Sequence, residues 1–280
     1  NYHFTGWSGS AVDAGKVADP NSATPTVTLD ADYALQANFV IDRRTLTVSS
    51  TAGGSVSIPG EGSFEYDRGS EVSVIAVADL NYHFTGWSGS AVDAGKVADP
   101  NSATTTVTLD ADYTLQANFA IDRRTLTVSS TAGGSVSAPG EGSFEYDQGS
   151  EVSVIAAADP NYHFTGWTGT AVDAGKVADA NSATTTVTLD ADYTLQASFA
   201  IDRRTLTVSS TAGGSVSIPG EGAFEYDRGS EVSVIAVADL NYRFTGWTGS
   251  AVDAGKAADA NSATTTVTLD ADYTLEANFA

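Results

Sequence analysis

The stretch NYHFTGW, residues 81–87, places three aromatic side chains within seven residues. The same stretch begins again at residues 1 and 161, and at 241 with Arg243 in place of the histidine. Successive copies start 80 residues apart, and the sequence between them is nearly identical. A fixed period of this kind indicates a tandem array of equivalent modules. Because each aromatic ring can bury about 150–250 Å², we expect the stretch to form the centre of each module's core.

The period divides the chain into the C-terminal half of a repeat, residues 1–40, followed by complete repeats at 41–120, 121–200 and 201–280. A unit of this size can bury about 60% of its unfolded surface, so we expect each complete repeat to fold as a separate module. Since the chain begins with Asn in the middle of a repeat, we expect it to be an excerpt from a longer polypeptide.

Apolar and polar residues alternate along most of each repeat, which predicts a mainly β fold. The strands predicted in the first complete repeat are residues 45–49, 55–58, 64–66, 71–78, 105–109 and 113–119. Glycines between the first two predict a hairpin, and the turn Asp110-Ala111-Asp112 predicts a second hairpin from the last two. The longest run, 71–78, is predicted as a central strand. Residues 88–104 are predicted as a long loop with a helical turn around 92–98.

The alternation also predicts which side chains are buried. These are Leu46, Val48, Val56, Val72, Val74, Phe84, Trp87, Val107, Leu109, Leu115 and Phe119, with their equivalents in the other repeats.

The net charge is −22, from 13 Lys and Arg against 35 Asp and Glu. Nucleic-acid binding requires clustered basic residues, so nucleic acid is excluded as a partner. No apolar run approaches the length of a membrane span, so we expect no membrane insertion in this segment. The absence of Cys excludes disulfides and zinc–thiolate sites.

Carboxylates in turns raise the question of a divalent cation. Asp42 lies at a repeat junction, and Asp110 and Asp112 flank a predicted turn, so the three are candidate ligands for Ca²⁺. Their spacing matches no calcium loop, and Asp is common in turns because it hydrogen-bonds to the nearby backbone. We therefore expect no cofactor, and Ca²⁺ is the alternative.

No pattern of residues suggests an enzyme. His3, His83 and His163 are replaced by Arg243 in the fourth copy, which favours a surface or packing role. The Lys at positions 16, 96, 176 and 256 follows a glycine in a polar loop, whereas an intramolecular Lys–Asp or Lys–Asn amide requires a buried lysine beside an acid. We expect these lysines to remain unmodified.

The connections between repeats are short. Only six residues, 120–125, lie between Phe119 at the end of one repeat and Leu126, the first apolar residue of the next repeat's first predicted strand, and they include no Gly or Pro. Such a connection limits rotation, so we predict an elongated rod. The residues predicted to make inter-repeat contacts are Arg43, Arg44, Asp110, Asp112, Arg123 and Arg124, together with the loop at 88–104, which could also contact other copies of the chain.

The order of motifs resembles a known family. A Leu-Thr-Val strand, a Gly-Gly turn, Tyr-Asp-x-Gly-Ser-x-Val, Asn-Tyr-x-Phe-x-Gly-Trp-x-Gly and a Thr-Val-Thr-Leu-Asp-Ala-Asp-Tyr end recur in this order. Together they resemble the divergent internalin B-repeat family of bacterial surface proteins, across the whole chain. The resemblance implies a small, β-grasp-like module that is extracellular and not catalytic. The stretch at 91–104 is longer than in typical members.

These observations favour a stalk or filament shaft of a bacterial cell-surface or extracellular protein, related to adhesion or biofilm formation. The alternative is a repeated binding module that recognises a polysaccharide or a partner protein through exposed aromatics or the loop Ser88–Thr104. The exposure of Trp87 distinguishes the two, because a buried ring cannot stack on a sugar.

Overall fold

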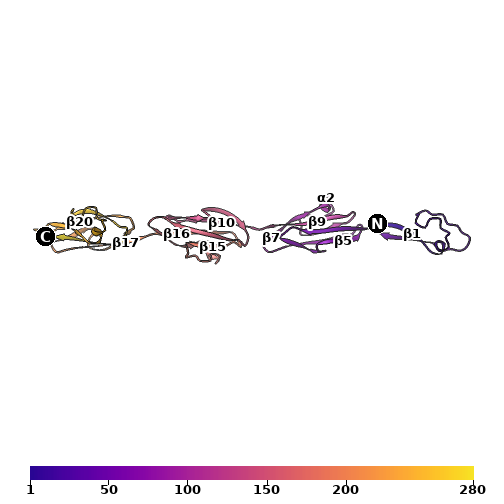
Figure 1. Ribbon diagram of the computed structural model, residues 1–280, viewed down its shortest axis with the longest axis horizontal. Coiled ribbons are helices and arrows are strands. Elements are labelled where there is room, and N and C mark those ends of the chain that lie inside the picture. Colours follow the sequence, from indigo (N-terminus) through magenta and orange to yellow (C-terminus); the bar gives the residue numbers. More distant parts are fainter. The chain divides into compact units, whose positions relative to one another are not determined.

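The computed structural model describes all 280 residues, and the chain divides into two compact units, Asn1–Asp122 and Arg123–Ala280. Each unit is considered by itself. Every complete repeat has the same seven strands and a single helical turn. Figure 1 shows that strands make up most of each complete repeat.

In the first complete repeat, whose last strand runs one residue past position 120, the elements are β3 (Arg43–Ser50), β4 (Gly54–Ile58), β5 (Gly62–Asp67), β6 (Glu71–Ala78), β7 (Tyr82–Ser88), α2 (Ser90–Asp93), β8 (Thr104–Thr108) and β9 (Tyr113–Ile121). In the next repeat they are β10 (Arg123–Ser130), β11 (Gly134–Ala138), β12 (Gly142–Asp147), β13 (Glu151–Ala158), β14 (Tyr162–Thr168), α3 (Thr170–Asp173), β15 (Thr184–Thr188) and β16 (Tyr193–Ile201). The last repeat contains β17 (Arg203–Ser210), β18 (Gly214–Ile218), β19 (Gly222–Asp227), β20 (Glu231–Ala238), β21 (Phe244–Thr248), α4 (Ser250–Asp253), β22 (Thr264–Thr268) and β23 (Tyr273–Phe279). The half repeat contains β1 (Tyr2–Ser8), α1 (Ser10–Asp13) and β2 (Gln36–Ile41).

The strands of each complete repeat form two sheets. A four-stranded sheet has the order β5-β3-β9-β7, and a three-stranded sheet has the order β4-β6-β8. All neighbours are antiparallel except β3 and β9, which run parallel. β6 is the central strand of its sheet, as the sequence predicts.

The core lies between the two sheets. In β3, Leu46 and Val48 point inward while the intervening Thr47 is exposed, which is the alternation of a strand with one buried face. The opposing side chains come from the other sheet and include Val74 and Val107, both fully buried. Two sheets that bury their facing side chains in this way form a β-sandwich.

The predicted core is confirmed. Nine of the eleven residues predicted to be buried are buried, and Phe84 and Phe119 are partly buried at its border, where their rings meet edge to face with centroids 5.9 Å apart. The Trp87 side chain is only 5% exposed, and its indole N–H donates to the carbonyl of Ser102 at 2.9 Å.

Both predicted hairpins are wrong. β3 pairs with β5 and β9, whereas β4 pairs with β6 in the other sheet. Similarly, β8 pairs with β6, whereas β9 pairs with β3 and β7. The glycine-containing and aspartate-containing turns therefore carry the chain from one sheet to the other. The module also differs from a β-grasp fold, because α2 has four residues and cannot cover a sheet.

The half repeat lacks the strands that would cover its apolar face. Its strands β1 and β2 form a two-stranded sheet. Leu29 is 76% exposed, whereas its equivalent Leu109 is fully buried in the complete repeat. The difference arises because Leu109 packs in a core to which β3 and β6 contribute.

We predict that Trp87→Ala destabilises the repeat 41–120 by about 3–5 kcal/mol, because the substitution leaves a large cavity between the sheets. Urea unfolding followed by far-UV circular dichroism should then show an added transition at lower urea concentration. Thr85→Ala on the same strand removes an exposed side chain and is the control. A single transition at the original midpoint in the Trp87 variant would contradict the assigned core.

Candidate functional site

Four residues join the half repeat to the first complete repeat, and we call them the joint. The His3 Nδ1 lies 2.8 Å from Asp42 Oδ1, and the Arg68 guanidinium lies 3.9 Å from the other carboxylate oxygen. The Asn1 side-chain amide donates to the Arg68 carbonyl at 2.7 Å. Backbone bonds from Asp42 N to Asn1 O and from Arg68 N to Asp42 O, both 2.7 Å, complete the joint. The half repeat thus contacts the tip of the β5–β6 turn.

The same joint occurs in the second unit, between repeats 121–200 and 201–280. His163 Nδ1 lies 2.7 Å from Asp202 Oδ1, and Arg228 donates to Asp202 Oδ2 at 3.3 Å. The hydrogen bond from His163 is the largest effect that lowers the pKa of Asp202, just as the bond from His3 lowers the pKa of Asp42. The joint is therefore a small cluster in which a histidine and an arginine lie beside one aspartate, and it recurs at equivalent positions.

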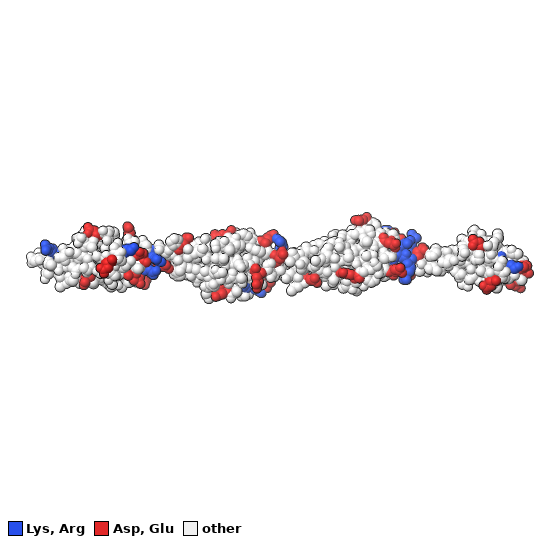
Figure 2. Space-filling model, viewed as in Figure 1, with Lys and Arg blue, Asp and Glu red and all other residues white.

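The residues predicted to make inter-repeat contacts find their partners within their own repeats. Arg43 lies 3.5 Å from Asp67, Arg123 lies 3.1 Å from Asp147, and Arg124 donates to Gln148 at 2.8 Å. The Arg44 guanidinium donates only to the neighbouring carbonyl of Arg43. The arginine that reaches the junction aspartate is Arg68 or its equivalent Arg228. Figure 2 shows most of the basic side chains in a few clusters with acidic residues beside them.

A second cluster, which we call the loop clip, recurs in all four copies. The Lys96 ammonium lies 2.6 Å from Asp110 Oδ2, and the Tyr113 hydroxyl donates to Asp110 Oδ1 at 2.6 Å. The bonds from Lys96 and Tyr113 lower the pKa of Asp110 to about 2. The equivalent trios are Lys16, Asp30 and Tyr33; Lys176, Asp190 and Tyr193; and Lys256, Asp270 and Tyr273. The clip fastens the segment after α2 to the turn before β9.

The loop clip meets one requirement for the intramolecular lysine–aspartate amide considered from the sequence, namely a lysine next to an acid. The structure does place each lysine beside an acid, which the sequence did not predict. However, the side chains of Lys96 and Asp110 are 31% and 43% exposed, and their contact raises the pKa of the lysine and lowers that of the aspartate. Amide formation requires a neutral amine and a protonated acid, so this environment favours an ion pair.

The three candidate calcium ligands lie in different environments. Asp42 belongs to the joint, Asp110 belongs to the loop clip, and Asp112 Oδ1 accepts from the Thr45 amide at 2.8 Å. No three metal-ligating side chains converge on one point. Asp112 is thus a turn residue that hydrogen-bonds to a neighbouring strand.

The loop at 88–104 packs on its own repeat. The Trp87 amide donates to the Pro100 carbonyl at 2.7 Å, and Val97 forms a β-bridge with Val107. The buried residues Ala91 and Val97 add the loop to the core. The helices have only four residues each, so none of them could span a membrane.

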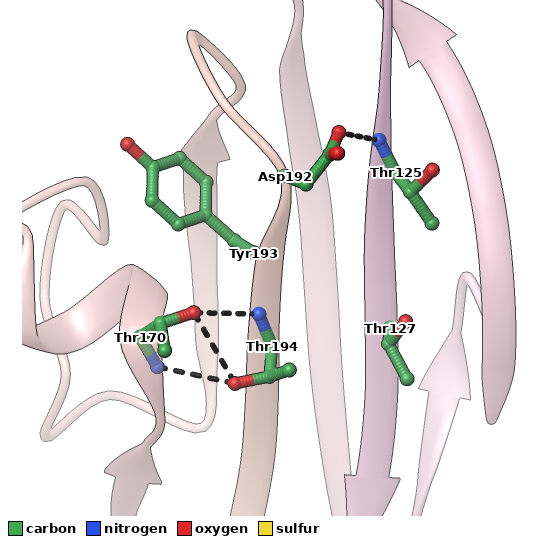
Figure 3. Close-up of a pocket in the computed structure, with 6 residues that line it drawn as sticks. All are labelled: Thr125, Thr127, Thr170, Asp192, Tyr193 and Thr194. Carbon is green, nitrogen blue, oxygen red and sulfur yellow. Dashed lines mark hydrogen bonds between the residues drawn. The ribbon is translucent and has the colours of Figure 1, made fainter.

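A shallow hollow of about 280 Å³ lies on the outer face of the four-stranded sheet in repeat 121–200 (Figure 3). Its lining residues are Thr125, Thr127, Thr170, Asp192, Tyr193 and Thr194. Their polar groups already bond to one another or to neighbouring residues: Asp192 accepts from the Thr125 amide at 2.8 Å, and the Thr170 and Thr194 hydroxyls lie 3.2 Å apart. Few polar groups therefore remain free to orient a ligand.

Comparison with known proteins gives one family. The family model described as "Divergent InlB B-repeat domain" matches residues 1–43, 44–123, 124–203 and 204–280. No curated protein matches the sequence. Among solved structures, the Bacillus anthracis TIE protein aligns with 91% of this chain and 54% of its own chain, at 7% identity and a TM-score of 0.41. A likeness of that size carries no argument about fold or function.

The loop clip predicts that the free energy of unfolding decreases at acidic pH. The pKa of Asp110 is about 2 in the folded chain against a reference value of 3.8, so its stabilisation is fully present above about pH 4 and is lost as the pH falls toward 2. Replacing the clip aspartates, Asp30, Asp110, Asp190 and Asp270, by Asn should reduce the fall in the urea midpoint between pH 5 and pH 2.

The control replaces the four exposed helix aspartates, Asp13, Asp93, Asp173 and Asp253, by Asn, which changes the net charge equally. An identical pH profile in both variants would show that the clip carboxylates contribute nothing specific.

We also predict that millimolar Ca²⁺ leaves the melting temperature unchanged, because Asp42, Asp110 and Asp112 do not converge. Differential scanning calorimetry with Ca²⁺ and with chelator tests this, with Na⁺ at matched ionic strength as the control. A rise in melting temperature with Ca²⁺ alone would restore these residues as ligands.

Proposed function

Because the chain belongs to the divergent InlB B-repeat family, we propose that it is the stalk or filament shaft of a bacterial cell-surface or extracellular protein. Its role is to hold other parts of that protein at a distance, in adhesion or biofilm formation. Its partners are its own neighbouring repeats and other copies of the filament. The proposal assigns it no catalytic activity, no cofactor and no nucleic-acid partner.

The way in which repeats are joined carries this proposal. A single residue separates the last strand of one repeat from the first strand of the next: Asp42 between β2 and β3, Asp122 between β9 and β10, and Asp202 between β16 and β17. Asp42 and Asp202 are also held by the joints. A connection this short leaves little freedom for bending, which suits a spacer.

The alternative function, recognition of a polysaccharide or partner protein, has less support. Its expected contact surface was exposed aromatics or the loop Ser88–Thr104. The Trp87 ring is buried, and the loop packs on its own repeat. We therefore propose the spacer role and not the binding role.

Small-angle X-ray scattering of the 280-residue chain tests the proposal. Beads of about 30 Å in a row give a radius of gyration of about 30 Å, whereas one compact domain of 280 residues gives about 19 Å. Insertion of Gly-Ser-Gly-Ser after Asp42, Asp122 and Asp202 should broaden the distance distribution. A value near 19 Å, or no effect of the insertions, would contradict the shaft. Antibody labelling of intact bacteria tests the surface location.

A further inference from the structure

The chain enters and leaves each complete repeat through two adjacent parallel strands. β3 begins at Arg43, directly after the link residue Asp42, and β9 ends at Ile121, directly before Asp122. The two strands are paired from Leu46 with Tyr113 to Ser50 with Ala117. Because they run in the same direction, the start of β3 and the end of β9 lie at opposite ends of the sheet.

This topology determines how tension acts on a repeat. A pull on the two connections draws β3 and β9 past each other along their length. The load is then shared by all the hydrogen bonds of the parallel ladder, which must break together. A pull across the ladder would instead break the bonds one after another, at lower force.

Further hydrogen bonds extend the pairing of β3 and β9 at both ends, and we call the whole arrangement the seam. At one end the Asp112 carboxylate accepts from the Thr45 amide at 2.8 Å. At the other end the Thr51 amide donates to the Ala117 carbonyl at 2.9 Å, and the Thr51 hydroxyl accepts from the Phe119 amide at 3.0 Å.

The same bonds occur in the other complete repeats. Asp192 accepts from the Thr125 amide, as Figure 3 shows, and Thr131 accepts from the Phe199 amide at 3.0 Å. In the last repeat, Asp272 accepts from the Thr205 amide at 2.9 Å. A reinforcement that recurs in every complete repeat is a property of the fold.

The surroundings of the seam oppose sliding. β3 and β9 are the two central strands of their sheet, with β5 and β7 outside them. Their inward side chains Leu46, Val48 and Leu115 are at most 2% exposed. Sliding of β3 past β9 would therefore also draw buried apolar side chains out of the core.

We propose that the seam is a mechanical clamp, by which each complete repeat bears tension along the chain without unfolding. The inference deepens the proposed stalk function, which supplies the source of the tension. The resistance itself is a property of the individual repeat.

Force spectroscopy on the 280-residue chain tests the clamp. The chain, held by its two ends, is expected to unfold in three steps, each adding roughly 250 Å of length. For the comparison, Ser49→Cys and Gln116→Cys provide the only two thiols of the chain, at paired positions across the seam. A pull between them acts across the ladder, and the unfolding force should be at least about twofold lower than in the end-to-end pull, because the bonds break in turn.

Substitutions within the seam identify the bonds that bear the load. Thr51→Val and the equivalent changes in the other repeats remove the side-chain acceptor for β9 and should lower the end-to-end force. Thr47→Val is the matched control, because Thr47 lies in β3, which ends directly before Thr51, but its hydroxyl is bonded to Ser63 of β5, at 3.0 Å. Urea unfolding of both variants corrects for any difference in overall stability.

Equal forces in the two pulling directions, or equal losses from Thr51→Val and Thr47→Val, would overturn the clamp. Neither result depends on the scattering experiment. A compact scattering profile together with a twofold ratio of unfolding forces would contradict the proposed stalk function but support the mechanical clamp.

Discussion

The parallel pairing of β3 with β9 is the contact on which each repeat depends. It joins residues about as far apart as the repeat allows, since Asp112 bonds to Thr45 across 67 positions. Once these strands pair, β4 and β6 from the first half and β8 from the second can form the opposite sheet and enclose the core. The half repeat shows what happens without this pairing. Its strand β2 pairs only with β1 and has no equivalent of β3 beside it, and Phe39 is 59% exposed.

The local pattern predicts the strands and the core of this fold but not the strand pairing. The alternation of apolar and polar residues in 45–49 predicts that one face of the strand is buried, and Leu46 and Val48 are buried. It does not predict which strands lie on either side. The rule for hairpins uses neighbouring strands, whereas here the turn at Gly53 takes the chain into the other sheet. The close approach of the Phe119 ring leaves no room for a side chain at Gly54, and this contact across 65 positions has no local signal.

The clusters of charge were missed for a related reason. Lys96 meets Asp110 because the intervening loop folds back on its own core, and the joint gathers residues from two different repeats. Their common feature is visible only in the structure: scarce cations are placed beside particular aspartates in a chain with an excess of acids. Each such contact fixes a loop or a turn, so the cations serve to organise the backbone in a strongly acidic chain.

The distance in sequence between β3 and β9 also determines the order in which the array can assemble. As the chain emerges from the ribosome, β3 has no parallel partner until its repeat is nearly complete. Its sequence is repeated in β10, so β9 could in principle pair with the wrong copy. The single residue between β9 and β10 is too short for a crossover connection, so β9 cannot form a parallel ladder with the strand that follows it directly. A short link therefore serves as a safeguard during folding, in a chain whose near-identical repeats would otherwise favour misassembly.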